Sequence, residues 1–252
     1  MKKYLLYSLA ALLSFIFFIV LLAPAAPIWS LFTASYGKEV FKRVPELQIS
    51  SIEGTIWEGK TNIHYREFPT SHLQWQISPV QLIQKIAEAD LEIEGKAHNF
   101  KTSLVVADNK FNLKNLHGTI DANYINQVSE NLGLTFSGAI DARSISVSGT
   151  IDKLSLVEGQ IYWSGGEIIS RTAQAGTQIF GLPPLEGDFS INDENGGIQL
   201  DIHQDQKVLI AITLKLDGWV LVDIKSGLFR LAGLSWKGDA GDTAITYEEK
   251  IF

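Results

Sequence analysis

Histidine, aspartate and glutamate are the side chains of this chain that are best suited to bind a metal ion, because its 252 residues include no cysteine. Without cysteine there is no disulfide, no thiolate zinc or iron–sulfur site and no thiol nucleophile. The five histidines show neither His-x-x-x-His nor His-Glu-x-x-His spacing, which would place two ligands on one helix face. They are His64, His72, His98, His117 and His203. We interpret them as solvated or cross-strand side chains and predict no metal site.

An acidic cluster near the C-terminus is the other group that could hold a metal. It comprises Asp239, Asp242, Glu248 and Glu249, with Gly238 and Gly241 interspersed. Calcium prefers several oxygen ligands from loop positions, but the loop spacing of an EF-hand is absent. We therefore interpret the cluster as a solvated charged turn.

No motif for covalent, phosphate or cofactor chemistry occurs. Ser164-Gly165-Gly166 lacks the leading glycine of a Gly-x-Ser-x-Gly nucleophile elbow, and there is no P-loop or dinucleotide-binding fingerprint. The formal net charge is −7, and lysine and arginine form no cluster that would contact phosphates. We therefore predict no catalytic residue, no cofactor and no nucleic-acid partner.

The N-terminal segment predicts how the chain is placed in the cell. Met1-Lys2-Lys3 precedes 19 residues without a charge, Tyr4 to Leu22. About 20 apolar residues cross a bilayer core of roughly 30 Å as a helix, whereas the apolar core of a cleaved signal peptide has about 7–15. We expect an uncleaved transmembrane anchor within residues 1–27. It would cross the inner membrane once, with its N-terminus in the cytoplasm and the bulk of the chain in the periplasm.

Residues 28–45 form a separate segment, because Pro24 and Pro27 interrupt a continuous helix. The apolar residues of this segment recur at roughly helical spacing and predict an amphipathic linker helix. This helix either packs on the domain that follows or lies at the membrane surface.

Beyond residue 45 the apolar period changes from helical to two. Residues 73–77 and 198–202 alternate strictly between apolar and polar types, which is typical of antiparallel strands with one buried face. Residues 79–87 and 124–132 instead show helical spacing and predict short helices at the ends of a sheet. Residues 46–252 are therefore predicted to form one extracytoplasmic, mainly β domain with two or three short helices.

Eight glycines recur in the local pattern apolar–polar–Gly–any–apolar. They are Gly54, Gly95, Gly118, Gly138, Gly149, Gly159, Gly187 and Gly218. The flanking apolar residues lie two before and two after, so we expect the glycine on the same buried face, where it permits a bend or a close approach. The pattern predicts one long, curved antiparallel sheet with the shape of a half-barrel or groove.

Five tryptophans lie in strand-like contexts: Trp57, Trp75, Trp163, Trp219 and Trp236. A packed aromatic ring buries about 150–250 Å², so core packing is one interpretation. The other is that some of these rings line an exposed apolar groove for a partner or an acyl chain.

Three phrases in a defined order are similar to a known family. Ile52-Glu53-Gly54-Thr55-Ile56-Trp57-Glu58-Gly59 is followed by Leu73-Gln74-Trp75-Gln76-Ile77-Ser78-Pro79 and later by Val157-Glu158-Gly159-Gln160-Ile161-Tyr162-Trp163. Together with the N-terminal anchor, they resemble type II secretion system protein N over nearly the whole chain. The family-motif residues, which we expect to be structural, are Gly54, Thr55, Trp57, Gly59, Trp75, Pro79, Gly159 and Trp163.

The resemblance implies a function without catalysis. It implies an accessory inner-membrane component of the machine that exports folded proteins across the outer membrane, with other secretion-system components as partners. The family is also similar to AsmA-like proteins, whose curved sheets are associated with lipid handling. The alternative is therefore a lipid-binding or lipid-transfer module with an open apolar β groove.

Overall fold

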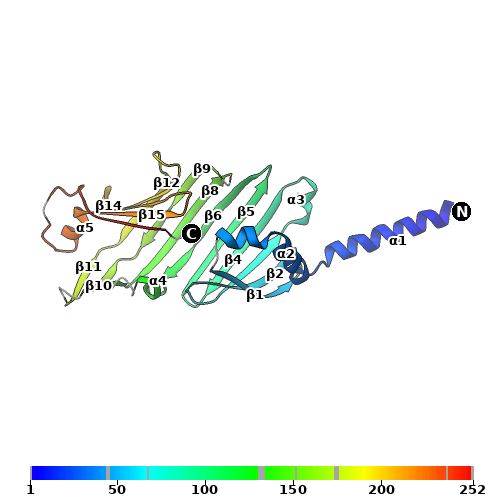
Figure 1. Cartoon of the computed structure of the whole chain (residues 1–252), viewed down its shortest axis with the longest axis horizontal. Helices are drawn as coiled ribbons and strands as arrows, with labels where there is room; N and C mark the ends of the chain where they lie inside the picture. Colours follow the sequence, from blue (N-terminus) through cyan, green and yellow to red (C-terminus); the bar gives the residue numbers. More distant parts are fainter. Residues whose placement is uncertain are drawn as a thin grey trace.

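The computed structural model describes residues 2–43, 46–66, 68–129, 134–150, 152–172, 176–236 and 238–250 (Figure 1). The helices in these ranges are α1 Lys2–Leu21, α2 Ala25–Arg43, α3 Pro79–Ile83, α4 Ala122–Ser129 and α5 Ser226–Leu231. Pro27 lies in the first turn of α2, where a residue without an N–H interrupts no helical hydrogen bond. Val44 and Pro45, at the predicted end of the linker helix, lie outside the described residues.

A 13-stranded sheet forms most of the molecule, and all of its neighbouring strands are antiparallel. In spatial order its strands are β1 Leu47–Gly54, β2 Glu58–Tyr65, β3 Ser71–Ile77, β4 Ala87–Gly95, β5 His98–Ala107, β6 Lys110–Asp121, β8 Ala139–Gly149, β9 Leu154–Trp163, β12 Leu185–Ile191, β13 Ile198–Gln204, β14 Lys207–Leu214, β15 Trp219–Lys225 and β16 Thr243–Lys250. The prediction of a mainly β chain built on a large antiparallel sheet is confirmed.

A second, 3-stranded sheet lies beside the large one and was not predicted from the sequence. Its strands are β7 Leu134–Phe136, β10 Gly166–Thr172 and β11 Gly176–Leu182, in the spatial order β11-β10-β7. The chain enters this sheet between β6 and β8 and again between β9 and β12. The order of strands in the large sheet therefore skips these three.

Strand register places polar and apolar side chains on opposite faces of the large sheet. One row of paired residues from β2 to β5 is polar: Lys60, Gln74, Glu92 and Lys101. On the opposite face, the paired row from β3 to β5 is apolar: Leu73, Ile93 and Phe100. The apolar face continues at the far end of the sheet as a row from β13 to β16: Ile202, Ile210, Ile224 and Ile245. The period-two alternation in the sequence thus describes the two faces correctly.

The sheet is open, because β1 and β16 stand at the two ends of the strand order. The accessible surface is 16370 Å², whereas a compact protein of 27.9 kDa exposes roughly 11,000 Å². Buried apolar residues in the large sheet lie mainly in its middle strands and include Ala142, Ile145, Leu154, Val157 and Leu185. Figure 1 shows α2 in front of β4 and its neighbours, nearer the β1 end of the sheet than these middle strands. The shape agrees with the predicted curved, groove-like sheet.

Two of the short helices were predicted, but their ends differ. The first, α3, stops at Ile83 because Lys85 adopts a φ of 61° and Ala87 already begins β4. The second, α4, begins at Ala122, two residues before the predicted start, and the predicted end at Leu132 lies outside the described residues.

Two elements near the C-terminus were not predicted from the sequence. Ser226 begins α5, where its N–H donates to the carbonyl oxygen of Asp242 at 2.9 Å. Glu248 and Glu249 were interpreted as part of a solvated charged turn, but they lie in β16, the end strand paired with β15. The alternation of apolar and polar residues in β16 is hard to recognise in the sequence, because its carboxylates are exposed to solvent on an end strand.

The N-terminal residues predicted to span the membrane form α1, which Figure 1 shows projecting away from the sheet. Within the part of the chain that the structure describes, no helix has both the length and the hydropathy needed to cross a membrane.

Candidate functional site

The first family phrase forms a tight turn between β1 and β2, which we call the junction turn (residues 54–59). Gly54 ends β1 with a φ of 91°, and it pairs with Gly59 across the turn. The Thr55 N–H donates to the carbonyl oxygen of Glu58 at 2.8 Å. The Thr55 hydroxyl oxygen accepts hydrogen bonds from the N–H groups of Trp57 (3.3 Å) and Glu58 (3.2 Å). The glycines and the threonine are thus the residues that close this turn.

The junction turn is joined to the end of α1. The indole N–H of Trp57 donates to the carbonyl oxygen of Val20 at 2.8 Å. The Ile56 N–H donates to the carbonyl oxygen of Ala23 at 3.0 Å, and Thr55 forms an isolated β-bridge with Pro24. These contacts tie the N-terminal helix to the first hairpin of the sheet, a role that the spacing of the sequence did not indicate.

The expected position of Gly54 on a buried strand face is wrong. Gly54 is exposed, and a Cβ there would lie 2.5 Å from the carbonyl oxygen of Glu58. A left-handed φ and this close approach, rather than packing between two layers, explain the glycine. A Cβ on Gly59 would lie 2.4 Å from the carbonyl oxygen of Glu53 and also 2.4 Å from Cζ2 of Trp75. The Trp75 ring therefore lies against the backbone of the junction turn.

The remaining family-motif residues lie elsewhere along the sheet. Pro79 is the first residue of α3, directly after β3. Gly159 has a φ of 129°, and a Cβ there would lie 2.4 Å from the Cα of Ile145 on the neighbouring strand. The indole N–H of Trp163 donates to the carbonyl oxygen of Ser137 at 2.9 Å and so ties β9 to the segment that follows β7. These three motif residues therefore lie apart from the junction turn, where the other five gather.

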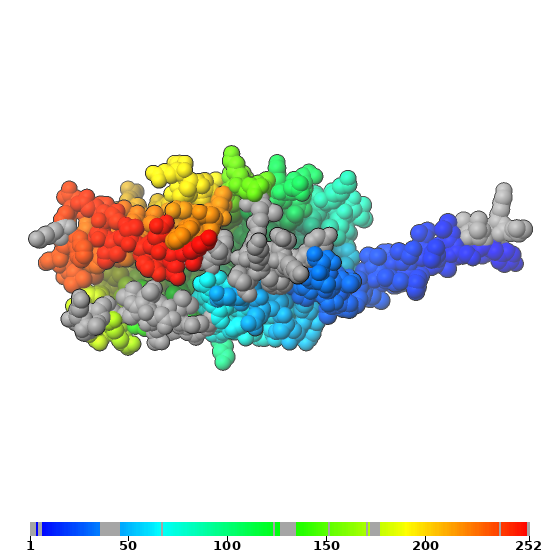
Figure 2. Space-filling view, viewed as in Figure 1, coloured from blue at the N-terminus to red at the C-terminus, as the bar shows by residue number. Residues whose placement is uncertain are grey.

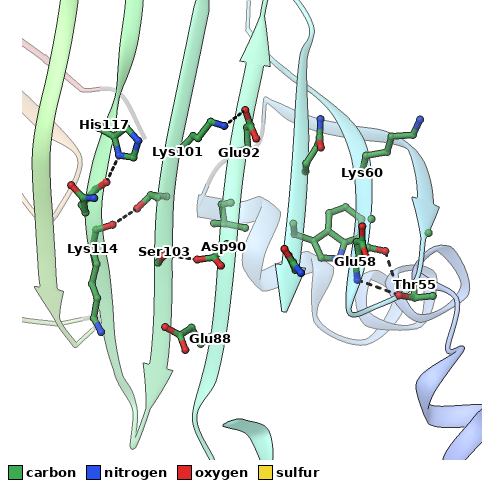
Figure 3. Close-up of a pocket in the computed structure, with 18 of the residues that line it drawn as sticks. Thr55, Glu58, Lys60, Glu88, Asp90, Glu92, Lys101, Ser103, Lys114 and His117 are labelled. Atoms are coloured by element: carbon green, nitrogen blue, oxygen red, sulfur yellow. Dashed lines mark hydrogen bonds and ion pairs between the residues drawn. The ribbon is translucent and has the colours of Figure 1, made fainter. Parts of the chain in front are cut away.

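A polar groove lies on the charged face of β2 to β6, next to the junction turn (Figure 3). Its volume is about 850 Å³, and it is open to solvent. Charged residues of both signs line it: Glu53, Glu58, Lys60, Glu88, Asp90, Glu92, Lys101 and Lys114. Figure 3 shows their side chains projecting from neighbouring strands. The sequence signal was the alternation of charged residues at every second position, which we read only as a solvated face.

Ion pairs and hydrogen bonds organise this polar groove. Glu92 pairs with Lys101 at 2.9 Å, and Glu53 pairs with Lys60 at 3.1 Å. The hydrogen bond from the Lys101 ammonium lowers the pKa of the Glu92 carboxyl below its ordinary value. The Glu92 carboxylate therefore remains charged at neutral pH. Such a surface suits recognition of a polar partner, because complementary charges select partners more than they add affinity.

Ser71 and His98 form a buried pair that resembles part of a nucleophilic site. The Ser71 hydroxyl lies 2.9 Å from Nε2 of His98. The ring of His98 reaches across β4 because Gly95 has no side chain there; a Cβ on Gly95 would lie 2.2 Å from Cε1 of His98. The Tyr124 ring packs on His98, with 4.6 Å between the ring centroids.

Among the described residues, no third group of a catalytic triad accompanies this pair. Nδ1 of His98 is buried and has no hydrogen-bond partner among the described residues, so no carboxylate orients the ring. Burial lowers the pKa of His98, which favours the neutral imidazole. The close packing of His98 against Gly95 and Tyr124 indicates a role in packing for this pair. His98 was expected to be solvated or cross-strand, and it is the buried histidine that links β3 to β5.

The other side chains that were considered as possible metal ligands lie apart from one another. His203 lies 2.8 Å from Asp188, whose pKa is lowered by a hydrogen bond from Gln160 and also by His203. Asp242 accepts the N–H of Asp239 at 2.7 Å in a turn, whereas Glu248 lies on β16 and pairs with Lys215 at 3.0 Å. In the part of the chain that the structure describes, no three such side chains come close enough to hold a metal ion.

Comparison with known proteins assigns the family. A family model described as type II secretion system (T2SS), protein N, matches residues 45–244. The chain belongs to the type II secretion system protein N family. The search of curated proteins and the search of solved structures found no match. The matched region contains the junction turn, the polar groove and all of the family-motif residues, whereas α1 and α2 lie before it.

Proposed function

We propose that this member of the secretion protein N family is an accessory inner-membrane component that acts by binding other components of the system. The single observation that carries the proposal is the family match over residues 45–244. The open sheet supports it, because a sheet with a charged groove on one face offers an extended docking surface. The family match favours this role over the alternative of a lipid-transfer module, which no comparison supports.

The inner-membrane location rests on the N-terminal segment. Tyr4 to Leu22 contains no charged residue, and several side chains of α1 are largely exposed, including Leu13 at 59%, Phe15 at 62% and Phe17 at 60%. Contiguous exposed apolar surface of this kind is costly in water. We place this segment in the bilayer, with Lys2 and Lys3 in the cytoplasm and the sheet in the periplasm.

A complementation experiment tests the secretion role. In a strain whose own gene for this protein is deleted, we expect secretion of the exported proteins to fall and the full-length chain to restore it. Membrane fractionation and protease protection in spheroplasts test the location. The sheet is expected to be digested from the periplasmic side and the N-terminus to be protected. Unchanged secretion in the deletion strain would contradict the proposed function, and a protease-resistant sheet would contradict the proposed orientation.

A further inference from the structure

We infer that α3 is a second membrane contact of this protein, whose exposed apolar side chains insert into the headgroup region beside the anchor. None of the five residues of α3 is buried. Val80 is 66% exposed, Leu82 is 40% exposed and Ile83 is 84% exposed. Three apolar side chains on one short helix form a local patch that water solvates poorly. The inference rests on the proposed location of α1 in the bilayer.

A chain of hydrogen bonds places α3 next to the end of α1. Trp57 donates through its indole N–H to Val20 of α1 at 2.8 Å. The carbonyl oxygen of the same Trp57 accepts the N–H of Ile77 at 2.6 Å, and Ile77 is two residues before the start of α3. The junction turn therefore links the helix proposed to enter the membrane with the strand end that carries α3.

The overall shape agrees with these contacts. Figure 1 shows α3 at the end of the sheet from which α1 projects, whereas β10, β11 and α5 lie at the opposite end. In Figure 2 the segment coloured as α3 lies at the same end of the body as α1. A bilayer that surrounds α1 would face this end of the sheet.

A lipid surface is the occupant that the local chemistry favours. Lys85 lies two residues after the end of α3 and is exposed, and a cation beside apolar side chains is attracted by anionic headgroups. On α2, which follows the anchor, Leu31 is 68% exposed and Ile28 is 42% exposed. Interfacial segments commonly combine such apolar side chains with nearby lysine. Two adjacent membrane contacts, α1 and α3, would set the tilt of the sheet relative to the membrane. A single contact through α1 would constrain this tilt less.

The absence of cysteine permits a direct test on the full-length protein. Ile83→Cys is labelled with an environment-sensitive fluorophore and reconstituted into vesicles of phosphatidylethanolamine and phosphatidylglycerol. We expect blue-shifted emission and about two-fold quenching by lipids that carry a quencher near the headgroup, as for an interfacial side chain. Ile179→Cys is the matched control, because Ile179 is 61% exposed on β11 at the opposite end. Phe15→Cys reports on the anchor.

The three probes separate the possible failures. Quenching at Phe15 and Ile83 but not at Ile179 supports the inference. Quenching at Phe15 alone contradicts the inference and leaves the anchor intact. If Ile83 is quenched no more than Ile179 and Phe15 is not quenched by lipids carrying a deep quencher, the proposed anchor and the inference both fail. Equal quenching at Ile83 and Ile179 contradicts a contact specific to α3.

Discussion

At the scale of single residues, Gly54 is defined by backbone geometry. Its φ of 91° is costly for any side chain, and a Cβ would meet the carbonyl oxygen of Glu58 at 2.5 Å. We expect Gly54→Val to lower the free energy of unfolding by about 1–3 kcal/mol, the usual range for forced overpacking. Urea unfolding of the full-length protein in detergent micelles, followed by tryptophan fluorescence, measures this loss.

Gly181→Val is the matched control for that substitution. A Cβ on Gly181 would meet nothing within 4 Å. Its stability should therefore stay near that of the wild type. Equal losses of unfolding free energy in Gly54→Val and Gly181→Val would contradict the role assigned to the backbone geometry of Gly54.

His98 makes stability depend on pH. Burial places its folded-state pKa below the ordinary value of 6.5, so the unfolded chain binds more protons between the two values. The contribution to stability is present above pH 6.5 and is lost as the pH falls through the lowered folded-state pKa. We expect His98→Gln to reduce the dependence of the unfolding free energy on pH, measured between about pH 7.5 and pH 5. A wild-type slope in His98→Gln would refute the assignment to His98.

At the scale of elements, the junction between α1 and the sheet depends on the side chain of Trp57. Trp57→Phe keeps an aromatic ring but removes the N–H that donates to Val20. We expect faster hydrogen exchange of the Ile56 amide, which bonds Ala23 at 3.0 Å. The expected increase is about three- to ten-fold, as for the loss of one neutral hydrogen bond. Exchange is measured on the full-length protein in detergent micelles.

Trp163→Phe is a control of the same chemistry, because it removes the indole donor to Ser137. It should leave the exchange of Ile56 unchanged. If Trp57→Phe also leaves that exchange unchanged, the hydrogen bond to Val20 does not hold the junction.

Elements with local signals could be predicted from the sequence, and elements that depend on distant contacts could not. Strict alternation at residues 73–77 and 198–202 predicted β3 and β13, and the Asp193–Gly197 segment forms the hairpin turn between β12 and β13. The bond between Trp57 and Val20 joins residues 37 apart in sequence. Nothing local marks it. The three-residue strand β7 also has no local signal in the sequence, because it is held in place by its pairing with β10.

The site was less predictable than the fold. The family phrases identified Gly54, Thr55 and Gly59, and these residues do close one turn. The polar groove was missed, because it arises only when register aligns charged residues from several strands. The pairing of Ser71 with His98 likewise needs Gly95 of the strand between them.

At the scale of the whole molecule, the open sheet explains why surface contacts rather than an enclosed site carry the proposed function. An enclosed active site needs a cavity shielded from water, whereas the polar groove of this sheet is open. The two end strands, β1 and β16, each have a neighbouring strand on one side only. A protein of this shape can contact partners over either face without rearranging a core.

The most direct test of this account is secretion per amount of protein in the deletion strain, measured beside immunoblots. The set comprises single alanine variants of the histidines outside the polar groove, which are His64, His72, His98 and His203, and of the acidic residues Asp239, Asp242, Glu248 and Glu249. The account predicts that each variant secretes as the wild type does once abundance is considered, with a loss of abundance expected for the buried His98. A single one of these substitutions that abolished secretion at full abundance would contradict a role by binding and would indicate a catalytic or metal-binding site.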